Sequence, residues 1–331
     1  MRFHCKNCKF PTKLRNGTDL RAALCPKCEH PLNLTEEERT FGKYELLEML
    51  GSGGFGMVLK VRQADTGSLF TLKLIEKASV SKAERVHLLR QIHSSRRLQH
   101  PSVVAAHDFG EQDDYWYLIS DFVDGLPLDQ WAREHSPTPT RSIKVCAQIG
   151  DALEYIHQQK FVHRDLKPGN IIVDFQECPH IIDFGLCKSE EDSDMMTIER
   201  YRAARHAIQD RKTLAPESIL GTPDYAAPEQ LAGDALLAKP QSDIYSLGVI
   251  LYELLAGKRP SHGIGRVFNG PLLTAKLKST GLPSNSVVRL RNLCMKAVSR
   301  NCNKRQTSAS VFSQACRELL SNGEESIPPV S

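Results

Sequence analysis

Four cysteines near the N-terminus have the spacing of a metal site. Cys5 and Cys8 form one Cys-x-x-Cys pair, Cys25 and Cys28 form a second, and sixteen residues separate the two pairs. Each such turn points two thiolates at one ion, so two turns supply the four sulfur ligands of a tetrahedral zinc site. A redox-active dithiol and a disulfide staple are the alternatives. Because four thiolates fill the coordination sphere, we expect the zinc ion to be structural rather than catalytic.

The segment that holds these cysteines, residues 1–34, is basic. It carries seven Lys or Arg residues against two acidic ones, a net charge of +5, whereas the other 297 residues sum to −1. Four thiolates and one Zn²⁺ would reduce this charge to about +3, and Phe3 and Phe10 are the only aromatic residues. This is a weak footprint for nucleic acid, and a protein contact is at least as consistent with it. The segment is too short for an adequate core, so the metal would supply most of its folding energy, and it resembles zinc ribbons.

A glycine-rich turn follows in a region of short apolar runs. The runs at 44–51, 57–64 and 68–75 predict consecutive antiparallel strands joined by tight turns, one of them at Asp65–Gly67. The first connection reads GSGGFG at residues 51–56. A dinucleotide-binding turn would open a helix, but a strand follows here. Glycines between antiparallel strands favour a flap whose backbone N–H groups approach phosphate oxygens.

Further motifs follow this turn in a fixed order. Lys73 lies within a predicted strand, residues 161–173 read FVHRDLKPGNIIV, residues 181–185 read IIDFG, and residues 221–229 read GTPDYAAPE. Together with the glycine turn, these motifs resemble the signature set of protein kinases. The motifs LKPGN and GTPDYAAPEQ resemble those of bacterial serine/threonine kinases of the eukaryotic-like (Hanks-type) family. The resemblance covers residues 44–320.

This resemblance implies an α+β fold, the two-lobed protein kinase fold, with a small β-rich lobe and a large helical lobe, preceded by a small zinc ribbon. The residues support helices in the large lobe, since Cys146, Ile149, Leu153 and Ile156 recur at helical spacing. The predicted organisation is a zinc ribbon at 1–34, a linker at 35–43, a kinase domain at 44–320 (small lobe 44–123, large lobe 124–320) and a flexible tail at 321–331.

The resemblance assigns roles in phosphoryl transfer, a reaction that asks the protein for positioning and charge neutralisation. Asp165 is expected to accept or orient the proton of the attacking hydroxyl group. Lys167 is expected to neutralise charge on the transferring phosphate, and a Lys at this position is typical of Ser/Thr kinases. Asn170 and Asp183 are expected to hold two Mg²⁺ (or Mn²⁺) ions through oxygen atoms.

The resemblance also implies an ATP site. Lys73 is expected to contact the α- and β-phosphates, and the backbones of Asp121 and Val123 are expected to face the adenine edge. Family members usually have Ala where this chain has Thr71. Thr71 would therefore narrow the side of the site that covers the adenine ring, or make it more polar. The residues expected to cover the triphosphate are Gly51, Ser52, Gly53, Gly54, Phe55 and Gly56. The residues expected to sandwich the adenine ring are Val58, Thr71 and Ile172.

Other residues are expected to support this machinery. By the resemblance, Asp243 supports the catalytic loop and Glu229 pairs with Arg305 to anchor the substrate loop. Thr222 stands where Ser/Thr kinases place a Thr near the catalytic Asp. Ser120 occupies the position that usually carries a larger gatekeeper residue, which would leave a cavity behind the adenine.

The helix after Lys73 departs from the family pattern. His100 and Pro101 resemble a sequence landmark that follows this helix in the family. Counting back from them places Gln91 at the position of the Glu that normally pairs with this Lys. Ser95 stands where a large apolar residue is usual. Glu84, about two turns upstream, is the alternative partner. Since Gln offers only a neutral hydrogen bond, we expect the productive position of this helix to be less firmly held.

The stretch between Asp183 and Glu229 is long, with an insert at about 189–218 that begins acidic and becomes basic and helix-like. A surface helix and a regulatory segment that closes the substrate cleft are the two interpretations. Arg164 is the usual partner for a phosphate on such a segment. The candidate phosphorylation sites are Ser189, Ser193, Thr197, Thr213 and Ser218.

The sequence therefore predicts an ATP-dependent protein serine/threonine kinase that acts on protein substrates, itself included, with a possible homodimer for autophosphorylation. The alternative is a pseudokinase scaffold that binds nucleotide without efficient turnover. A nucleic-acid sensor that reports through the kinase is a third hypothesis, although nucleic acid is not an expected partner. No run of 18 apolar residues and no apolar leader occur, so we expect no membrane contact and a cytoplasmic location.

Overall fold

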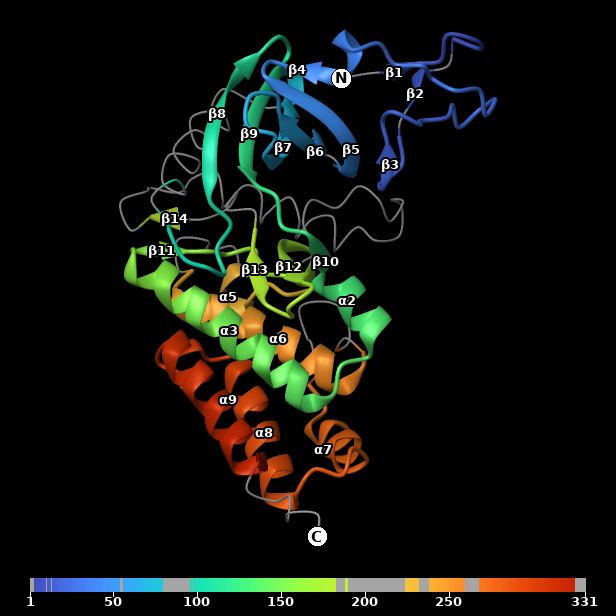
Figure 1. Ribbon diagram of the computed structural model, residues 1–331. Coiled ribbons are helices and arrows are strands. Elements are labelled where there is room, and N and C mark those ends of the chain that lie inside the picture. The colour runs from blue at the N-terminus through green and yellow to red at the C-terminus, as the bar shows by residue number, and fades with distance from the viewer. Residues whose placement is uncertain are drawn as a thin grey trace. The chain divides into compact units, whose positions relative to one another are not determined.

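The computed structural model describes residues 3–9, 11–12, 14–53, 56–79, 96, 98–182, 188–189, 224–231, 238–258, 260 and 268–324 (Figure 1). Two compact units make up the chain. The first consists of residues 1–96 and 105–122, and the second of residues 97–104 and 123–331.

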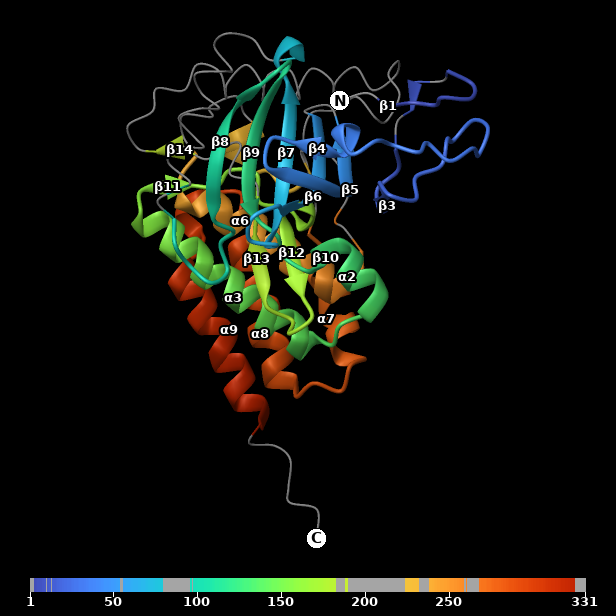
Figure 2. The same ribbon diagram turned by 45° about the horizontal axis from the view of Figure 1, so that its top comes forward.

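An antiparallel sheet is the centre of the first unit. Its strand order is β3-β5-β6-β7-β9-β8, and β4 also pairs with β5. The strands are β3 (Thr18–Asp19), β4 (Thr40–Phe41), β5 (Tyr44–Gly53), β6 (Gly56–Gln63), β7 (Leu69–Glu76), β8 (Ala106–Gln112) and β9 (Tyr115–Asp121), with a short 3₁₀ turn η2 at Lys77–Ser79. The three strands that the sequence predicts are thus confirmed, and Figure 2 shows them with β8 and β9.

The alternation of side chains explains why these segments form strands. Leu59 and Val61 on β6 and Leu72 and Leu74 on β7 point to the buried face, and the residues between them are more exposed. This period of two is the pattern of a sheet with one covered face. Between β6 and β7, Gly67 adopts a left-handed φ of 71°, which closes the predicted tight turn.

The cysteine segment packs directly onto this sheet. Two short strands, β1 (Phe3–His4) and β2 (Pro11–Thr12), pair with each other, and β3 joins the edge of the sheet beside β5. Its apolar residues lie in the same buried cluster as β5, β6 and β7. Those residues are Leu14, Leu20, Ala23 and Leu32. The segment therefore extends the core of the small lobe instead of forming a separate one.

The segment predicted as a polar linker, residues 35–43, contains regular secondary structure. A 3₁₀ turn, η1, spans Glu37–Arg39 and leads into β4. Phe41 on β4 is buried and meets the Tyr117 ring edge-on, with 5.5 Å between ring centroids. One aromatic residue in a polar run is sufficient to dock it, because it buries a large apolar area.

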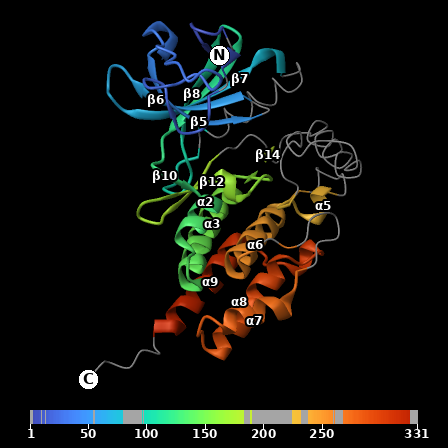
Figure 3. The same cartoon turned by 90° about the vertical axis from the view of Figure 1, so that its right-hand side faces the viewer.

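Helices make up most of the described part of the second unit, as predicted, and Figure 3 shows them from the side. They are α2 (Leu128–His135), α3 (Pro139–Gln158), α5 (Pro228–Leu231), α6 (Pro240–Ala256), α7 (Gly270–Lys278), α8 (Ser284–Ala297) and α9 (Ala309–Glu324), with 3₁₀ turns η3 (Pro168–Asn170) and η5 (Cys302–Lys304). The strands of this unit are β10 (Gly125–Pro127), β11 (Phe161–Val162), β12 (Ile171–Asp174), β13 (Pro179–Ile181) and β14 (Lys188–Ser189).

Helix α3 shows how local sequence sets these helices. Thr138 caps its N-terminus by accepting a hydrogen bond from the Arg141 N–H, and Pro139 occupies the first turn, where no donor is needed. The apolar positions predicted at helical spacing are all buried, which confirms the prediction. Helix α9 lies beside α3, where Arg317 pairs with Asp151.

Helix α6 is the central helix of this unit. Residues 244–252 are buried on every side, and Gly257 ends the helix with a left-handed φ of 69°. Even so, among the helices of the described residues, none combines the length and the apolar character that crossing a membrane requires. The tail predicted from residue 321 begins inside α9, which continues to Glu324.

Candidate functional site

A short loop between β11 and β12 brings together three of the predicted site residues. Lys167 donates from Nζ to Asp165 Oδ2 over 2.7 Å. Asn170 donates from Nδ2 to the Asp165 carbonyl oxygen over 2.8 Å and to Asp165 Oδ2 over 3.0 Å. The turn η3 holds this arrangement, because the Asn170 N–H also bonds to the Lys167 carbonyl. A carboxylate, an ammonium group and an amide thus converge within one loop.

The exposure and the hydrogen bonds of Asp165, Lys167 and Asn170 determine what these three side chains can bind. Asp165 and Lys167 are each about a quarter exposed (25% and 24%), so a second molecule could reach both. Asn170 is buried and gives both amide hydrogens to Asp165, which leaves its carbonyl oxygen as the atom able to bind a cation. Magnesium prefers oxygen ligands of this kind, so Asn170 fits the predicted metal role.

Asp243, on α6, holds the start of the same loop. Its Oδ2 accepts from the His163 N–H and from His157 Nε2, and its Oδ1 accepts from the Arg164 N–H, all over 2.8 Å. Burial would raise the pKa of this carboxyl group, but the hydrogen bond and electrostatic attraction of His157 outweigh it and lower the pKa below its ordinary value. The support expected from Asp243 is confirmed.

This support is needed because the loop contains strained backbone. Arg164 has a left-handed φ of 67°, which is unfavourable for a residue with a Cβ. Such a conformation persists only where surrounding contacts over-determine it. Here Asp243 accepts a hydrogen bond from the Arg164 N–H, and Gln230 Nε2 donates one to the Arg164 carbonyl oxygen over 2.9 Å. Both sides of the strained residue are therefore fixed.

Two members of this network, His157 and Gln230, were not predicted from the sequence. His157 stands at the end of α3, 86 residues away from Asp243 in the sequence. Gln230 also accepts from the Ala227 N–H, so it links α5 to the loop. The one local signal was that Gln230 directly follows Glu229 in a recognised motif, whereas nothing near His157 marks it.

A buried ion pair fixes α5 to the end of the domain. Arg305 NH1 and NH2 donate to the two oxygens of Glu229 over 2.6 and 2.8 Å, which confirms the predicted pair. Ser242 Oγ donates to the same carboxylate over 2.8 Å. Burial would raise the pKa of Glu229, but Arg305 lowers it below its ordinary value. The guanidinium is fully buried and the carboxylate is 16% exposed, so neither partner could be lost without leaving an uncompensated charge.

The glycine turn joins β5 to β6 in the first unit. Gly51 faces Val58, Ser52 faces Met57, and Gly53 faces Gly56 across the hairpin. Gly56 has a φ of 126°, and a Cβ atom there would lie 1.7 Å from the carbonyl oxygen of Leu74. This position accepts glycine alone, because the contact is with backbone and cannot be relieved by a side-chain rotation.

The remaining residues predicted to contact adenine or phosphate are divided between the two units. Lys73, on β7, lies between Val58 of β6 and Leu118 of β9. Thr71 faces Ser120 on β9, and Thr71 Oγ1 lies 3.5 Å from the carbonyl oxygen of Asp121. The extra hydroxyl group of Thr71 thus contacts the carbonyl that is expected to face adenine.

In the second unit, Val123 precedes β10, and Ile172 lies half-buried on β12 between Pro127 of β10 and His180 of β13. Other predicted residues lie outside the described part of the chain. They are Gly54, Phe55, Glu84, Gln91, Ser95, Asp183, Thr222 and the insert, except for Ser189 on β14.

The four N-terminal cysteines lie together in the first unit, and their sulfur atoms are all within 4.8 Å of one another. The Sγ atoms are 3.6 Å apart for Cys5 and Cys28, and 3.7 Å apart for Cys8 and Cys25. A disulfide bond would bring them to about 2.05 Å, whereas the edges of a tetrahedron with bonds of about 2.3 Å to zinc measure about 3.8 Å. The Cys8 N–H donates to Cys5 Sγ and lowers the pKa of this thiol. The arrangement fits a four-thiolate metal site.

Comparisons with known proteins agree with this geometry. The family model for the protein kinase domain matches residues 44–317. Serine/threonine-protein kinase PrkC of Bacillus subtilis is 30% identical over 68% of this chain and 32% of its own length. Serine/threonine-protein kinase PknB of Mycobacterium tuberculosis is 31% identical over 70% of this chain and 35% of its own length. The chain thus spans about a third of the length of these relatives.

The crystal structure of the PknI kinase domain from Mycobacterium tuberculosis matches the fold, with a TM-score of 0.63 and 24% identity over 85% of this chain and 96% of that one. Sequence motifs, catalytic-loop geometry, family model and fold agree with one another, and the chain belongs to the protein kinase domain family.

Proposed function

We propose that this chain is an ATP- and magnesium-dependent protein serine/threonine kinase that transfers the γ-phosphate of ATP to Ser or Thr hydroxyl groups of proteins, itself included. The observation that carries the proposal is the convergence of Lys167 and Asn170 on Asp165 within a loop anchored by Asp243. Kinases named for serine and threonine among the relatives support this substrate class. No specific observation favours the pseudokinase alternative.

Asp165 orients the attacking hydroxyl group in this proposal, and accepts its proton. Its carboxylate is held by two neighbours and remains partly exposed, as such a role requires. Lys167 lies 2.7 Å away and supplies a positive charge for the phosphate in transfer. The pair thus combines a proton acceptor with a charge stabiliser, which are the two contributions that phosphoryl transfer asks of this loop.

The metal site of the proposal uses the carbonyl oxygen of Asn170 and the carboxylate of Asp183. Bound Mg²⁺ or Mn²⁺ would neutralise the charge of the phosphate groups. The two hydrogen bonds from Asn170 to Asp165 orient the amide group of Asn170, and thereby its carbonyl oxygen.

The nucleotide residues of the proposal divide into phosphate and adenine groups. Lys73 and the glycine loop at 51–56 bind the phosphates, while the backbones of Asp121 and Val123 bind the adenine edge. Thr71 lies against the carbonyl of Asp121, which supports its place near the adenine. Val58 and Ile172 are the other apolar neighbours of the ring.

The cysteine cluster holds a structural Zn²⁺ ion in this proposal. The sulfur spacing supports it, as does the cover given by Leu20 and Leu32. Protein substrates are the partners, with a homodimer for autophosphorylation, and the proposed location is the cytoplasm.

The experiment that tests the function incubates the full chain with Mg²⁺, γ-labelled ATP and a generic Ser/Thr substrate such as myelin basic protein. We expect label on serine and threonine, and Asp165→Asn should reduce the rate at least 100-fold, because the proton acceptor is lost while the shape is kept. The matched control is Asp129→Asn, the same chemical change at an exposed ion pair on α2. Equal rates for wild type and Asp165→Asn would refute the assignment.

A further inference from the structure

Strand β5 leads directly into the glycine turn, and it is irregular on one side. In its pairing with β6 the register shifts between Leu46 and Glu48 and again between Met49 and Gly51. Two residues, Leu47 and Leu50, therefore have no partner position on β6 within the described ladder. Such bulges bend a strand and leave backbone groups outside the ladder. The second shift ends at the first glycine of the turn.

The cysteine segment satisfies the backbone of this irregular stretch. Thr18 and Asp19 of β3 pair with Met49 and Glu48, on the edge of β5 opposite β6. The Leu20 N–H donates over 2.9 Å to the carbonyl of Leu47, the bulged residue, and the Gly17 N–H donates over 2.6 Å to the carbonyl of Met49. A buried backbone group needs a partner of this kind. Gly17 and Leu20, the residues on either side of β3, therefore supply hydrogen bonds to β5 that β6 does not.

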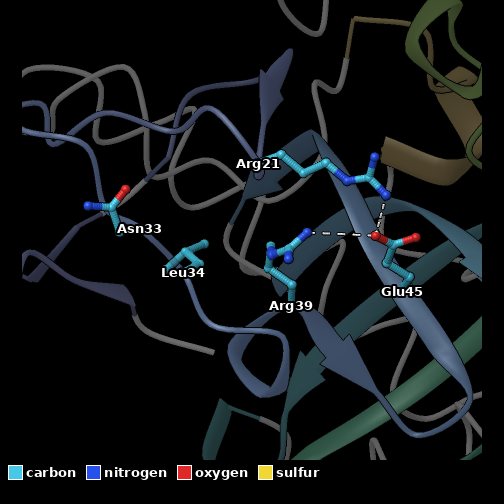
Figure 4. A pocket seen from close by; sticks show the side chains of 5 residues that line it. All are labelled: Arg21, Asn33, Leu34, Arg39 and Glu45. Atoms are coloured by element: carbon cyan, nitrogen blue, oxygen red, sulfur yellow. Dashed lines mark hydrogen bonds and ion pairs between the residues drawn. The ribbon is translucent and has the colours of Figure 1, made fainter.

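Apolar and charged contacts reinforce the junction. Leu20 and Leu32 are buried in one cluster with Leu46 and Met49 of β5. At the surface, Arg21 pairs with Glu45 of β5 (Figure 4), and 2.5 Å separates Arg21 NH2 from Glu45 Oε1. The junction therefore runs from the first residues of β5 to within two residues of Gly51.

The cysteine cluster in turn holds β3 in place. Cys5 and Cys25 are buried in the same cluster as Leu20, and a segment of this size has little stability without its metal. Loss of the metal would release β3, leave the Leu47 and Met49 carbonyls without their donors, and loosen the strand that ends in the glycine turn.

From this chain of contacts we propose that strand β3 and Leu20, held by the metal-bound cysteines, are positioning elements for the glycine turn, so that metal binding and nucleotide binding are coupled. The inference rests on the proposed kinase function and on the proposed zinc ion. Since coupling between two sites is reciprocal, the metal strengthens nucleotide binding by the same factor by which nucleotide strengthens metal binding.

The test measures the dissociation constant of the magnesium complex of a non-hydrolysable ATP analogue on the full chain, with metal content determined on the same samples. We expect one zinc ion per chain. Removal of zinc by a chelator should raise the dissociation constant at least about five-fold, the lower end of ordinary coupling between sites. The analogue should slow the chelator's removal of zinc.

Two leucine variants separate positioning from general loss of stability. Leu20→Ala should raise the dissociation constant and the KM for ATP about five-fold and leave kcat within about two-fold. Leu290→Ala, on α8, is the matched control, because both leucines are 1% exposed. This control should lower Tm by a similar amount and leave nucleotide affinity unchanged. Arg21→Gln, which leaves the core intact, should give a smaller rise than Leu20→Ala, and Arg15→Gln, an exposed change in the same segment, should give none.

The outcomes are distinguishable. Unchanged affinity after zinc loss and in Leu20→Ala overturns the positioning role, and so does an equal loss of affinity in Leu290→Ala. Absence of zinc with a loss of affinity in Leu20→Ala refutes the zinc ion and supports the positioning role of β3. Absence of nucleotide binding by the wild-type chain overturns this inference together with the proposed kinase function.

Discussion

The catalytic loop and the junction between the cysteine segment and β5 hold their functional residues by different means. In the loop, buried charged side chains bind backbone groups, as Asp243 binds the N–H groups of His163 and Arg164. At the junction, backbone pairs with backbone, leucines pack together, and the ion pairs lie at the surface. A few buried charged side chains thus fix the loop, whereas many weak contacts together stabilise the junction.

The two regions should therefore be sensitive to different substitutions. A buried charge that loses its partner is costly, so single substitutions should damage the large lobe. A surface ion pair contributes little, because water already solvates both partners well. The junction should therefore tolerate single polar changes and respond mainly to loss of its metal or of its buried leucines.

The largest effect should come from the ion pair of the large lobe. Glu229→Ala leaves the fully buried Arg305 without its carboxylate, and we expect the free energy of unfolding to fall by about 3–5 kcal/mol. Urea denaturation measures this change. Glu318→Ala, which removes an exposed partner of Arg289, is the control and should have little effect. Similar midpoints for the two variants would show that burial does not govern the strength of these pairs.

Acid should affect the large lobe next. The folded pKa values of Asp243 and Glu229 lie below their ordinary values of 3.8 and 4.5. Both carboxylates therefore contribute stability that is fully present above about pH 4.5 and is lost as the pH falls through the lower, folded pKa values. Thermal unfolding between pH 7 and pH 2 should show a plateau followed by a steep fall.

The control for this pH dependence is Asp243→Asn, which lacks one of the two titrating groups. Its stability at neutral pH should be lower than that of the wild type, and it should decrease less steeply as the pH falls. Identical slopes for this variant and the wild type would assign the acid sensitivity to other carboxylates.

The smallest effect should come from the junction surface. Glu45 is approached by Arg21, Arg39 and Arg62, so its removal leaves three guanidinium groups without a common carboxylate. Because these side chains are 23–52% exposed, whereas Arg305 is fully buried, we expect Glu45→Ala to shift the unfolding midpoint several-fold less than Glu229→Ala does. The shift should shrink further in 0.5 M salt, owing to screening. An effect as large as that of Glu229→Ala would abolish the distinction between the two regions.

The candidate site was largely predictable, because its motifs have fixed local offsets. Asp165, Lys167 and Asn170 lie within six residues, so the backbone of one turn brings them together wherever that turn forms. The cysteine pairs follow the same logic, since each Cys-x-x-Cys turn is local. The strands around the glycine turn were also predictable, because alternation of side chains is a property of the segment itself.

Contacts between distant segments could not be predicted in this way. His157 reaches Asp243 across 86 residues, and nothing in the periodicity of α3 marks the one histidine that does so. Strand β3 has only two residues, too few to carry any pattern, yet it covers the edge of β5. Its place depends on the two bulges of β5 and on the leucines that pack beneath it.

Residue type and short spacing are enough to predict the carboxylate, the ammonium group and the amide of the catalytic loop and the four thiolates of the cysteine cluster. It takes the folded chain to show that the cysteine segment shares the core of the small lobe and hydrogen-bonds to the backbone of the strand that enters the glycine turn. The physical reason is that burial and hydrogen-bond satisfaction are properties of surfaces brought together by folding, and no local window of sequence contains both surfaces.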